Sequence, residues 1–216
     1  MTALVLDNVR VDHAAGTPWE TCGLQNVNLQ LEAGERVLVV GGNGSGKSTL
    51  ASVMAGLILP TEGTCTLDGI PIEEQAAQVT LVIQHTRLQL MRPTVREELE
   101  DLADHTTVIT PAVNRLGLNG LLHRRIDELS GGQQRRVGLA GALVRKTPLI
   151  LLDEPMAGLD RESRHQLVHA LEELPHDSIV VVVTHDLPAS RPILHQGLRG
   201  RLLHIDNGRV RESVDR

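Results

Sequence analysis

The 216-residue sequence predicts an α/β fold, in which helices cover both faces of a mostly parallel sheet. We also expect an antiparallel β edge and a helical subdomain inserted into this core. Three observations predict it. Short apolar segments of strand type alternate with helical segments along the chain. A glycine-rich loop joins one buried-type strand directly to a helix. Between about residues 85 and 128 the sequence becomes charged and helical in pattern, without the β-branched runs of core strands.

The individual elements follow from the apolar pattern. Strands are expected over residues 4–11, 27–31, 36–40, 64–67, 78–83, 149–152, 179–183, 201–205 and 209–211. The main helices are expected over residues 48–57, 133–145 and 161–174. The pair Asn207-Gly208 predicts a tight turn between the last two strands. We therefore expect one domain over residues 1–216, with a core of about 1–85 and 133–216 and a helical subdomain of about 86–132.

Composition narrows the class of protein. Hydrophobic residues make up 41% and charged residues 22%, which is ordinary for a soluble domain with a buried core. The net charge of −6 predicts no broad basic surface, so no nucleic-acid partner is expected. The chain has one Trp and neither Tyr nor Phe, so it offers no aromatic platform for single-stranded bases. The apolar runs are shorter than the ~20 residues that cross a bilayer, so another chain would have to supply any membrane part.

The glycine-rich loop fits the pattern G-x-x-x-x-G-K-[ST], with a strand before it and a helix after it. Glycines let backbone N–H groups curl around phosphates, the lysine supplies a point charge, and the serine hydroxyl can bind Mg²⁺. By itself this loop predicts a nucleotide-binding P-loop protein, kinases and GTPases included. The candidate ATP-binding residues are Gly41, Gly42, Asn43, Gly44, Ser45, Gly46, Lys47, Ser48 and Thr49.

A second helix start, later in the chain, carries a glycine pair. Ser130 and Gln133 fit an ordinary capping box, which begins helices in many unrelated proteins. A plain cap does not need Gly131 and Gly132 between its members, however. The two glycines leave exposed N–H donors and so predict a second anion site. Because one phosphate loop has no use for it within its own chain, its natural partner is ATP on another subunit.

Polar side chains follow three of the predicted buried strands. Asp153 and Glu154 follow the strand over residues 149–152. Acidic residues at strand ends are common turn formers. In a chain that also has a phosphate loop, however, they predict a Mg²⁺ ligand and a group that activates water. Gln84 follows another strand, where it could touch Mg²⁺ or the attacking water. His185 ends a third strand, where its imidazole could bond the γ-phosphate.

At this point the sequence resembles the ABC transporter ATPases, nearly from end to end. GGNGSGKST resembles the Walker A motif, Gln84 the Q-loop, LSGGQ the signature, LILLDEP Walker B, AGLD with Asp160 the D-loop, and His185 the switch histidine. The resemblance implies a RecA-like core with a helical subdomain. It also implies two ATPases that close head to tail, with each ATP between the phosphate loop of one chain and Ser130–Gln133 of the other.

A finer resemblance is to the ATPases of energy-coupling factor transporters, which import vitamins or transition-metal ions. It rests on Gly16-Thr17-Pro18-Trp19, on Gln89-Leu90 followed by Thr94-Val95 and Glu98, and on LSGGQQRRVGLAGAL. The sequence departs from that family at three places. His13 stands near the position of the adenine-stacking aromatic, which predicts weaker stacking and looser nucleotide selectivity. Thr86-Arg87-Leu88 replaces an acidic pair that would contact the membrane partner. The sequence ends shortly after the closing hairpin, which predicts a weak dimer without ATP.

The resemblance implies an ATP-binding and ATP-hydrolysing subunit that energises uptake of a vitamin or metal ion. Such a subunit lies at the cytoplasmic face of the membrane, with integral membrane subunits and a second ABC ATPase as partners, in a homodimer or a heterodimer. ATP and Mg²⁺ are the implied cofactors. The catalytic residues would be Lys47, Gln84, Glu154 and His185, and the Mg²⁺ ligands Ser48, Gln84 and Asp153.

Three alternatives compete with this interpretation. Another importer or exporter class of ABC ATPase fits the same motifs. A soluble ABC ATPase that acts on the ribosome or on DNA would usually show a second ATPase domain with a basic linker, or long coiled coils, and the sequence has neither. A P-loop kinase has no use for the LSGGQ segment.

Overall fold

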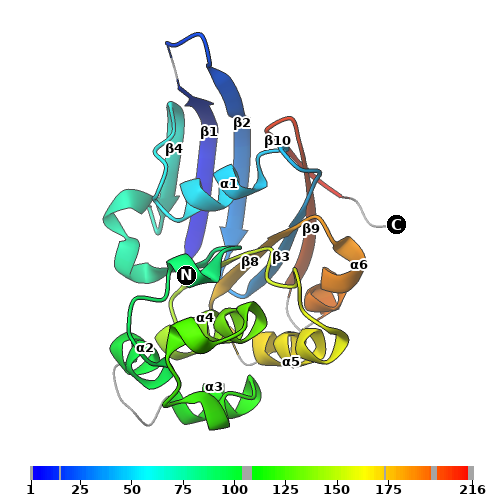
Figure 1. Cartoon of the computed structure of the whole chain (residues 1–216). Coiled ribbons are helices and arrows are strands. Elements are labelled where there is room, and N and C mark those ends of the chain that lie inside the picture. Colours follow the sequence, from blue (N-terminus) through cyan, green and yellow to red (C-terminus); the bar gives the residue numbers. More distant parts are fainter. Residues whose placement is uncertain (1, 15, 104–108, 173, 196–198, 214–216) are drawn as a thin grey trace.

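The computed structural model describes residues 2–14, 16–103, 109–172, 174–195 and 199–213. It confirms the predicted α/β class, with two sheets and their helices (Figure 1). The strands are β1 (Ala3–His13), β2 (Thr21–Glu32), β3 (Glu35–Val40), β4 (Glu62–Leu67), β5 (Ile70–Pro71), β6 (Val79–Val82), β7 (Leu149–Asp153), β8 (Ile179–Thr184), β9 (Arg199–Asp206) and β10 (Arg209–Glu212). The α-helices are α1 (Lys47–Met54), α2 (Val95–Leu102), α3 (Ile109–Arg115), α4 (Gly131–Arg145), α5 (Arg161–Glu172) and α6 (Leu187–Ser190).

The larger sheet has six strands in the order β10-β9-β3-β8-β7-β6, all parallel except β10, which runs antiparallel to β9. Strands β3, β7 and β8 are buried along their whole length, as expected for a parallel sheet covered on both faces. Pairing places Val40 beside Thr184 and Asp153 beside Val183. The segments that follow these strands therefore emerge at one edge of the sheet.

The antiparallel part is larger than predicted and forms a separate sheet in the order β2-β1-β4-β5. Strand β2 begins at Thr21, six residues before the predicted strand, because residues 21–24 also pair with β1 despite lacking a clear apolar alternation. Register shifts along β1 accommodate these pairs. The closing hairpin forms as predicted, with Asn207 and Gly208 both at positive φ (47° and 72°).

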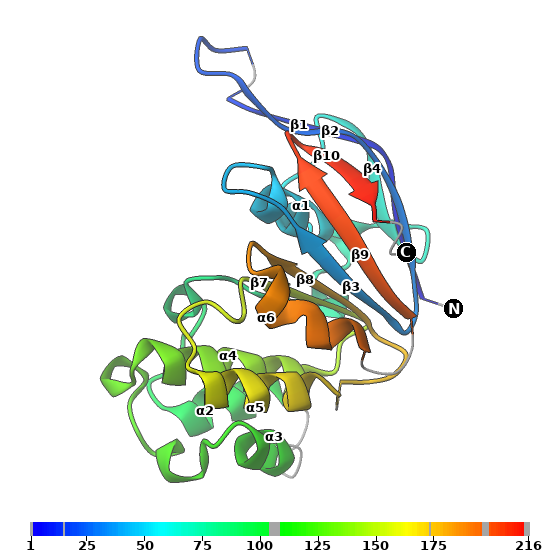
Figure 2. The same ribbon diagram turned by 90° about the vertical axis from the view of Figure 1, so that its right-hand side faces the viewer.

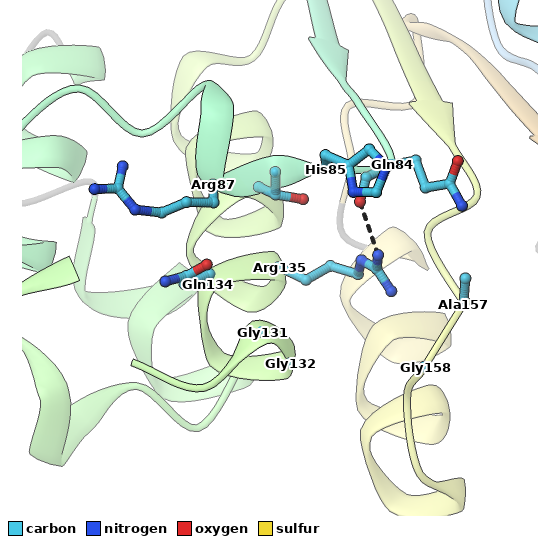
Figure 3. A pocket seen from close by; sticks show the side chains of 10 residues that line it. Gln84, His85, Arg87, Gly131, Gly132, Gln134, Arg135, Ala157 and Gly158 are labelled. Carbon is cyan, nitrogen blue, oxygen red and sulfur yellow. Dashed lines mark hydrogen bonds between the residues drawn. The ribbon is translucent and has the colours of Figure 1, made fainter. Parts of the chain in front are cut away.

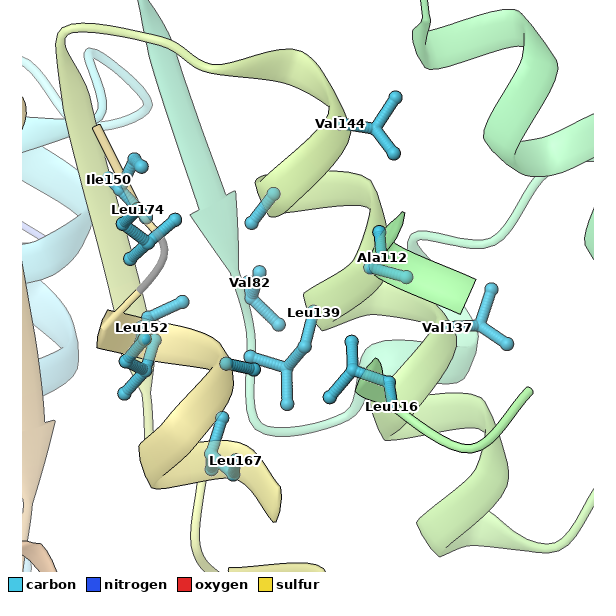
Figure 4. Packing of buried hydrophobic residues seen from close by; sticks show 14 of the residues in the cluster. Val82, Ala112, Leu116, Val137, Leu139, Val144, Ile150, Leu152, Leu167 and Leu174 are labelled. Carbon is cyan, nitrogen blue, oxygen red and sulfur yellow. The ribbon is translucent and has the colours of Figure 1, made fainter. Parts of the chain in front are cut away.

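Two apolar cores cover the two faces of the six-stranded sheet. Along β7, Leu149 and Leu151 face the antiparallel sheet and α1, whereas Ile150 and Leu152 face α4 and α5. Figure 2 shows α1 between the two sheets, and Figure 4 shows the packing around Leu152, Leu139 and Val82. The continuous apolar run of this strand is thus explained by burial on both sides.

Helices α2 and α3 pack against α4 in the core below the sheet. Helix α2 begins at a complete capping box formed by Thr94 and Glu97. Residues 104–108 of the expected helical subdomain lie outside the described residues, as does Glu173 of the helix predicted over 161–174. The subdomain boundaries at residues 86 and 132 stay a prediction. No helix in the described ranges is both long and apolar enough to span a membrane.

Candidate functional site

The phosphate loop connects β3 to α1, as its sequence predicts. Gly46, the N-cap of α1, has a φ of 107°, and an added Cβ would lie 2.6 Å from the carbonyl oxygen of Gly23. Both the backbone conformation and the close approach therefore require glycine. No side chain caps α1, so the N–H groups of its first turn face the loop. A helix start without a side-chain cap can bind an anion, which is the role that the sequence analysis expected of this loop.

Lys47 lies folded over this loop. Its Nζ donates hydrogen bonds to the carbonyl oxygens of Gly41 (2.9 Å) and Gly42 (2.8 Å), and its side chain is buried. Ser45 is also buried, and its Oγ has no hydrogen-bond partner among the described residues. A buried positive charge, an unpartnered hydroxyl and a bare helix start thus converge in one loop.

Asp153, the last residue of β7, is 8% exposed. Its Oδ1 is buried and has no hydrogen-bond partner in the part of the chain that the structure describes. Burial raises the pKa of the carboxyl above its ordinary value and the Glu154 charge adds to this, while the Ser48 hydroxyl and the Lys47 charge act in the opposite direction. An unpartnered carboxylate oxygen beside a hydroxyl is a donor set of the oxygen type that Mg²⁺ prefers. Asp153 and Ser48 therefore fit the metal-binding role that the sequence suggested.

Glu154 follows Asp153 with a φ of 51° and is 6% exposed. Its Oε1 lies 2.7 Å from Nδ1 of His185, and its Oε2 accepts a hydrogen bond of 3.0 Å from Oγ1 of Thr184. Both carboxylate oxygens are therefore held by residues at the end of β8. The sequence analysis did not name Thr184; the signal was its place at the end of a strand adjacent to β7.

Lys47, Ser48 and Glu154 line one cavity of about 520 Å³. Gln84 and His185 lie at its exposed margin. His13 also lines it, with Nε2 3.3 Å from Oγ1 of Thr49, and its ring packs over Gly23. The structure thus brings ten of the predicted residues together in this lining and adds three that the sequence analysis missed. Gly41, Gly42, Ser45 and Asp153 are not among the described residues that line the cavity. The full lining is His13, Thr21, Cys22, Gly23, Asn43, Gly44, Gly46, Lys47, Ser48, Thr49, Gln84, Glu154 and His185.

The turn Ser130–Gln133 does not face this cavity. Helix α4 begins at Gly131, two residues earlier than predicted, because Ser130 and Gln133 form a complete capping box. Gly131 and Gly132 instead line a separate cavity of about 400 Å³, together with Gln84 and Arg135 (Figure 3). In the described part of the chain, no residue of the turn lines the phosphate-loop cavity.

Asp160 is also placed apart from the phosphate loop. Its Oδ1 accepts a hydrogen bond of 2.7 Å from the backbone N–H of Ser163, at the start of α5. This bond lowers the pKa of Asp160. The structure therefore gives Asp160 a capping role, and among the described residues it lines neither of the two cavities.

Comparison with known proteins decides the family. The family model for ABC transporters matches residues 24–157, which include the phosphate loop, the glycine turn and both acidic residues. The chain belongs to the ABC transporter ATPase family. An uncharacterized ABC transporter ATP-binding protein of Mycobacterium tuberculosis is 46% identical over 98% of this chain. This ABC ATPase domain spans 31% of the length of that relative.

ATP-binding proteins of energy-coupling factor transporters are also among the relatives of this ABC ATPase domain. The transporter ATP-binding protein EcfA2 of Clostridium acetobutylicum is 31% identical, and the match covers 84% of this chain and 70% of EcfA2. A solved dimeric ATP-binding cassette in a post-hydrolysis state, bound to ADP and Pi, is 28% identical. It superimposes with a TM-score of 0.84, and the match covers 97% of both chains.

Proposed function

We propose that this ABC ATPase domain binds Mg-ATP and hydrolyses it when paired with a second ATPase domain. The observation that carries this proposal is the buried carboxylate of Glu154, held by His185 and Thr184 in the cavity that also contains Lys47. A nucleotide-binding loop alone requires no such group. A carboxylate fixed opposite the phosphates can orient a water molecule and accept its proton.

The cavity residues divide the work of phosphoryl transfer. The hydrogen bonds from Lys47 to the carbonyl oxygens of Gly41 and Gly42 hold its positive charge in the loop before ATP binds. When ATP binds, Lys47 exchanges these carbonyl oxygens for phosphate oxygens. Ser48, Asp153 and Gln84 would hold Mg²⁺, which neutralises charge on the phosphates when bound. His185 orients Glu154 and presents its other ring nitrogen, Nε2, to the γ-phosphate.

A second chain completes the site. The Ser130–Gln133 turn lines a different cavity from the phosphate loop, so one chain holds the two parts of the site separately. Head-to-tail pairing would place the N–H groups of Gly131 and Gly132 at the γ-phosphate on the partner. The dimeric state of the solved ADP- and Pi-bound cassette supports this arrangement.

We further propose that the domain energises uptake of a small solute, a vitamin or metal ion, from the cytoplasmic face of a membrane complex. The energy-coupling factor relatives and a taurine import ATP-binding protein of Yersinia pestis, 36% identical, support import. Leu88 and Met91 are 75% and 80% exposed beside Arg87, which supports a docking surface for a membrane partner.

The test of hydrolysis compares the wild-type chain with Glu154→Gln. The variant should bind ATP with wild-type affinity, lose at least about a hundredfold in kcat and accumulate as an ATP-bound dimer in sedimentation. Glu74→Gln, a change at an exposed carboxylate outside the cavity, serves as the matched control. Unchanged turnover in Glu154→Gln would remove Glu154 from its proposed role. Co-purification from membranes tests transport: recovery of an integral membrane protein supports it, and recovery of ribosomes or DNA contradicts it.

A further inference from the structure

Arg135 lies near the start of α4 and reaches across the second cavity (Figure 3). Its Nη2 donates a hydrogen bond of 2.8 Å to the main-chain oxygen of Gln84. A Cβ added at Gly158 would lie 3.8 Å from its Nη1, so the guanidinium also lies in van der Waals reach of that loop. One side chain therefore connects the helix that bears the glycine turn with the loops that follow β6 and β7.

The charge of Arg135 has no carboxylate within salt-bridge distance among the described residues. Burial lowers the pKa of its guanidinium, and the field of Glu154 acts in the opposite direction. A partly buried cation held by a carbonyl is stabilised less than one in an ion pair. Because this placement stabilises the guanidinium less than an ion pair would, we infer that the hydrogen bond from Arg135 to Gln84 has a role besides stabilising α4.

The neighbours of Arg135 on α4 contact a different region. Gln134 donates to the carbonyl oxygen of Ile126 (2.9 Å), and Arg136 donates to that of Leu116 (3.0 Å), both in the helical region below the sheet. Of the hydrogen bonds described for these three side chains, the one from Arg135 reaches the loop that carries Gln84.

Packing holds the same loop at a second point. Thr86 is buried, and its methyl group presses against Gly138 of α4, where an added Cβ would collide with it. The Thr86 hydroxyl also bonds to the carbonyl of Ile83, which tightens the turn. The Gln84 loop therefore contacts the first half of α4 at two points: by packing at Thr86 and by a charge-assisted hydrogen bond at Gln84.

We propose that Arg135 is a positioning residue that fixes the main chain of Gln84, so that the Gln84 side chain stays at the margin of the phosphate-loop cavity. Through the same bond, the position of Gln84 is linked to the helix whose start forms the Ser130–Gln133 turn. The inference rests on the proposed function in one respect, namely that Gln84 contacts the metal ion of bound Mg-ATP. Without the Arg135 bond, the phosphate loop still binds ATP, but Mg²⁺ strengthens that binding less.

The experiment measures the dissociation constant of ATP by calorimetry, in excess Mg²⁺ and in excess EDTA, for the wild-type chain, Arg135→Gln and Arg135→Lys. The matched control is Arg145→Gln, because Arg145 lies on the same helix and also donates to a backbone carbonyl, that of Ala76, away from both cavities. In EDTA, Arg135→Gln should bind ATP within about twofold of the wild-type affinity. The factor by which Mg²⁺ strengthens ATP binding should fall about tenfold in this variant. Arg135→Lys should recover part of it, since an ammonium group can also donate to a carbonyl.

Four outcomes would overturn the proposal: an unchanged Mg²⁺ effect in Arg135→Gln, an equal loss in Arg145→Gln, loss of ATP binding in EDTA for both Arg135 variants, or a wild-type chain whose ATP affinity Mg²⁺ does not strengthen. The third outcome would assign Arg135 to the fold itself. Because the assay measures binding and not turnover, it separates this proposal from the proposed function. A chain that binds Mg-ATP as expected but releases no phosphate contradicts hydrolysis and still decides the role of Arg135.

Discussion

Nδ1 of His185 lies 2.7 Å from Oε1 of Glu154, although 31 positions separate the two residues in the sequence. The pair forms because β7 and β8 are adjacent parallel strands that end level with each other. The side chain of His185 is 54% exposed, whereas the side chain of Glu154 is 8% exposed, so a solvent-accessible imidazole contacts a buried carboxylate. A buried carboxylate is in this way oriented by a residue that an incoming nucleotide can also contact.

The hydroxyl of Thr184 holds the other oxygen of Glu154, and it is fully buried. Thr184→Val keeps the volume but removes this hydrogen bond, together with the one that the hydroxyl accepts from the backbone N–H of Asp186, so the carboxylate gains rotational freedom. We expect kcat to fall by about three- to tenfold with little change in ATP affinity. Thr80→Val is the control, because Thr80 is also buried and its hydroxyl accepts a hydrogen bond from Thr147, whereas the hydroxyl of Thr184 donates to Glu154. An equal loss of kcat in both variants would contradict a specific role for Thr184.

Lys47 supplies positive charge to the phosphate loop. Lys47→Gln should weaken ATP binding in calorimetry by about 2 kcal/mol or more, because a charge-assisted contact to phosphate is lost. Lys146, the other lysine of the chain, lies exposed at the end of α4, so Lys146→Gln provides a control for loss of one charge. If the two variants bind ATP equally well, Lys47 has no special place in the site.

The buried carboxyl of Asp153 predicts that the stability of the fold depends on pH. Burial raises the pKa of its carboxyl above the ordinary value, so the ionised form that prevails at neutral pH destabilises the fold. Asp153→Asn removes that charge and should raise Tm at pH 7. The difference should shrink as pH falls through the raised pKa, because the wild-type carboxyl then becomes neutral as well. Thermal melts between pH 7 and about pH 4 check this expectation, and a difference in Tm that stays constant over that range would contradict it.

The ring of His13 is the predicted stacking partner of the base of a bound nucleotide. Its imidazole packs over Gly23 beside Thr49 and offers a smaller face than a phenol ring. His13→Tyr should strengthen ATP binding by about 1 kcal/mol through base stacking. Binding of inorganic triphosphate, which has no base, should not change. If triphosphate binding strengthens equally, the effect does not arise from stacking.

Local sequence pattern predicted much of the candidate site, because several of its residues follow directly from strands. The phosphate loop, the acidic pair and Gln84 each stand at the end of an apolar run, and parallel strands bring such ends together. The same reasoning predicted the fold class and the closing hairpin. These features require no knowledge of side-chain direction.

The remaining contacts depend on three-dimensional neighbours that no local pattern reveals. The bond from Arg135 to Gln84 joins residues 51 positions apart, and its donor lies among several arginines of similar appearance. Asp160 caps a helix within its own segment, a local contact that the family motif obscured. The first residues of β2 lack the alternation of a strand, and cross-strand pairing with β1 decides their conformation.

The placement of the phosphate loop and the glycine turn in different cavities determines how turnover should depend on chain concentration. Each chain carries the phosphate loop in one cavity and the glycine turn in the other. If two copies of this chain pair, the initial rate of hydrolysis at high dilution rises with the square of chain concentration. If the partner is a different ATPase, the rate rises in proportion to each chain separately. The reaction order in dilute solution therefore identifies the partner as a second copy or as another protein.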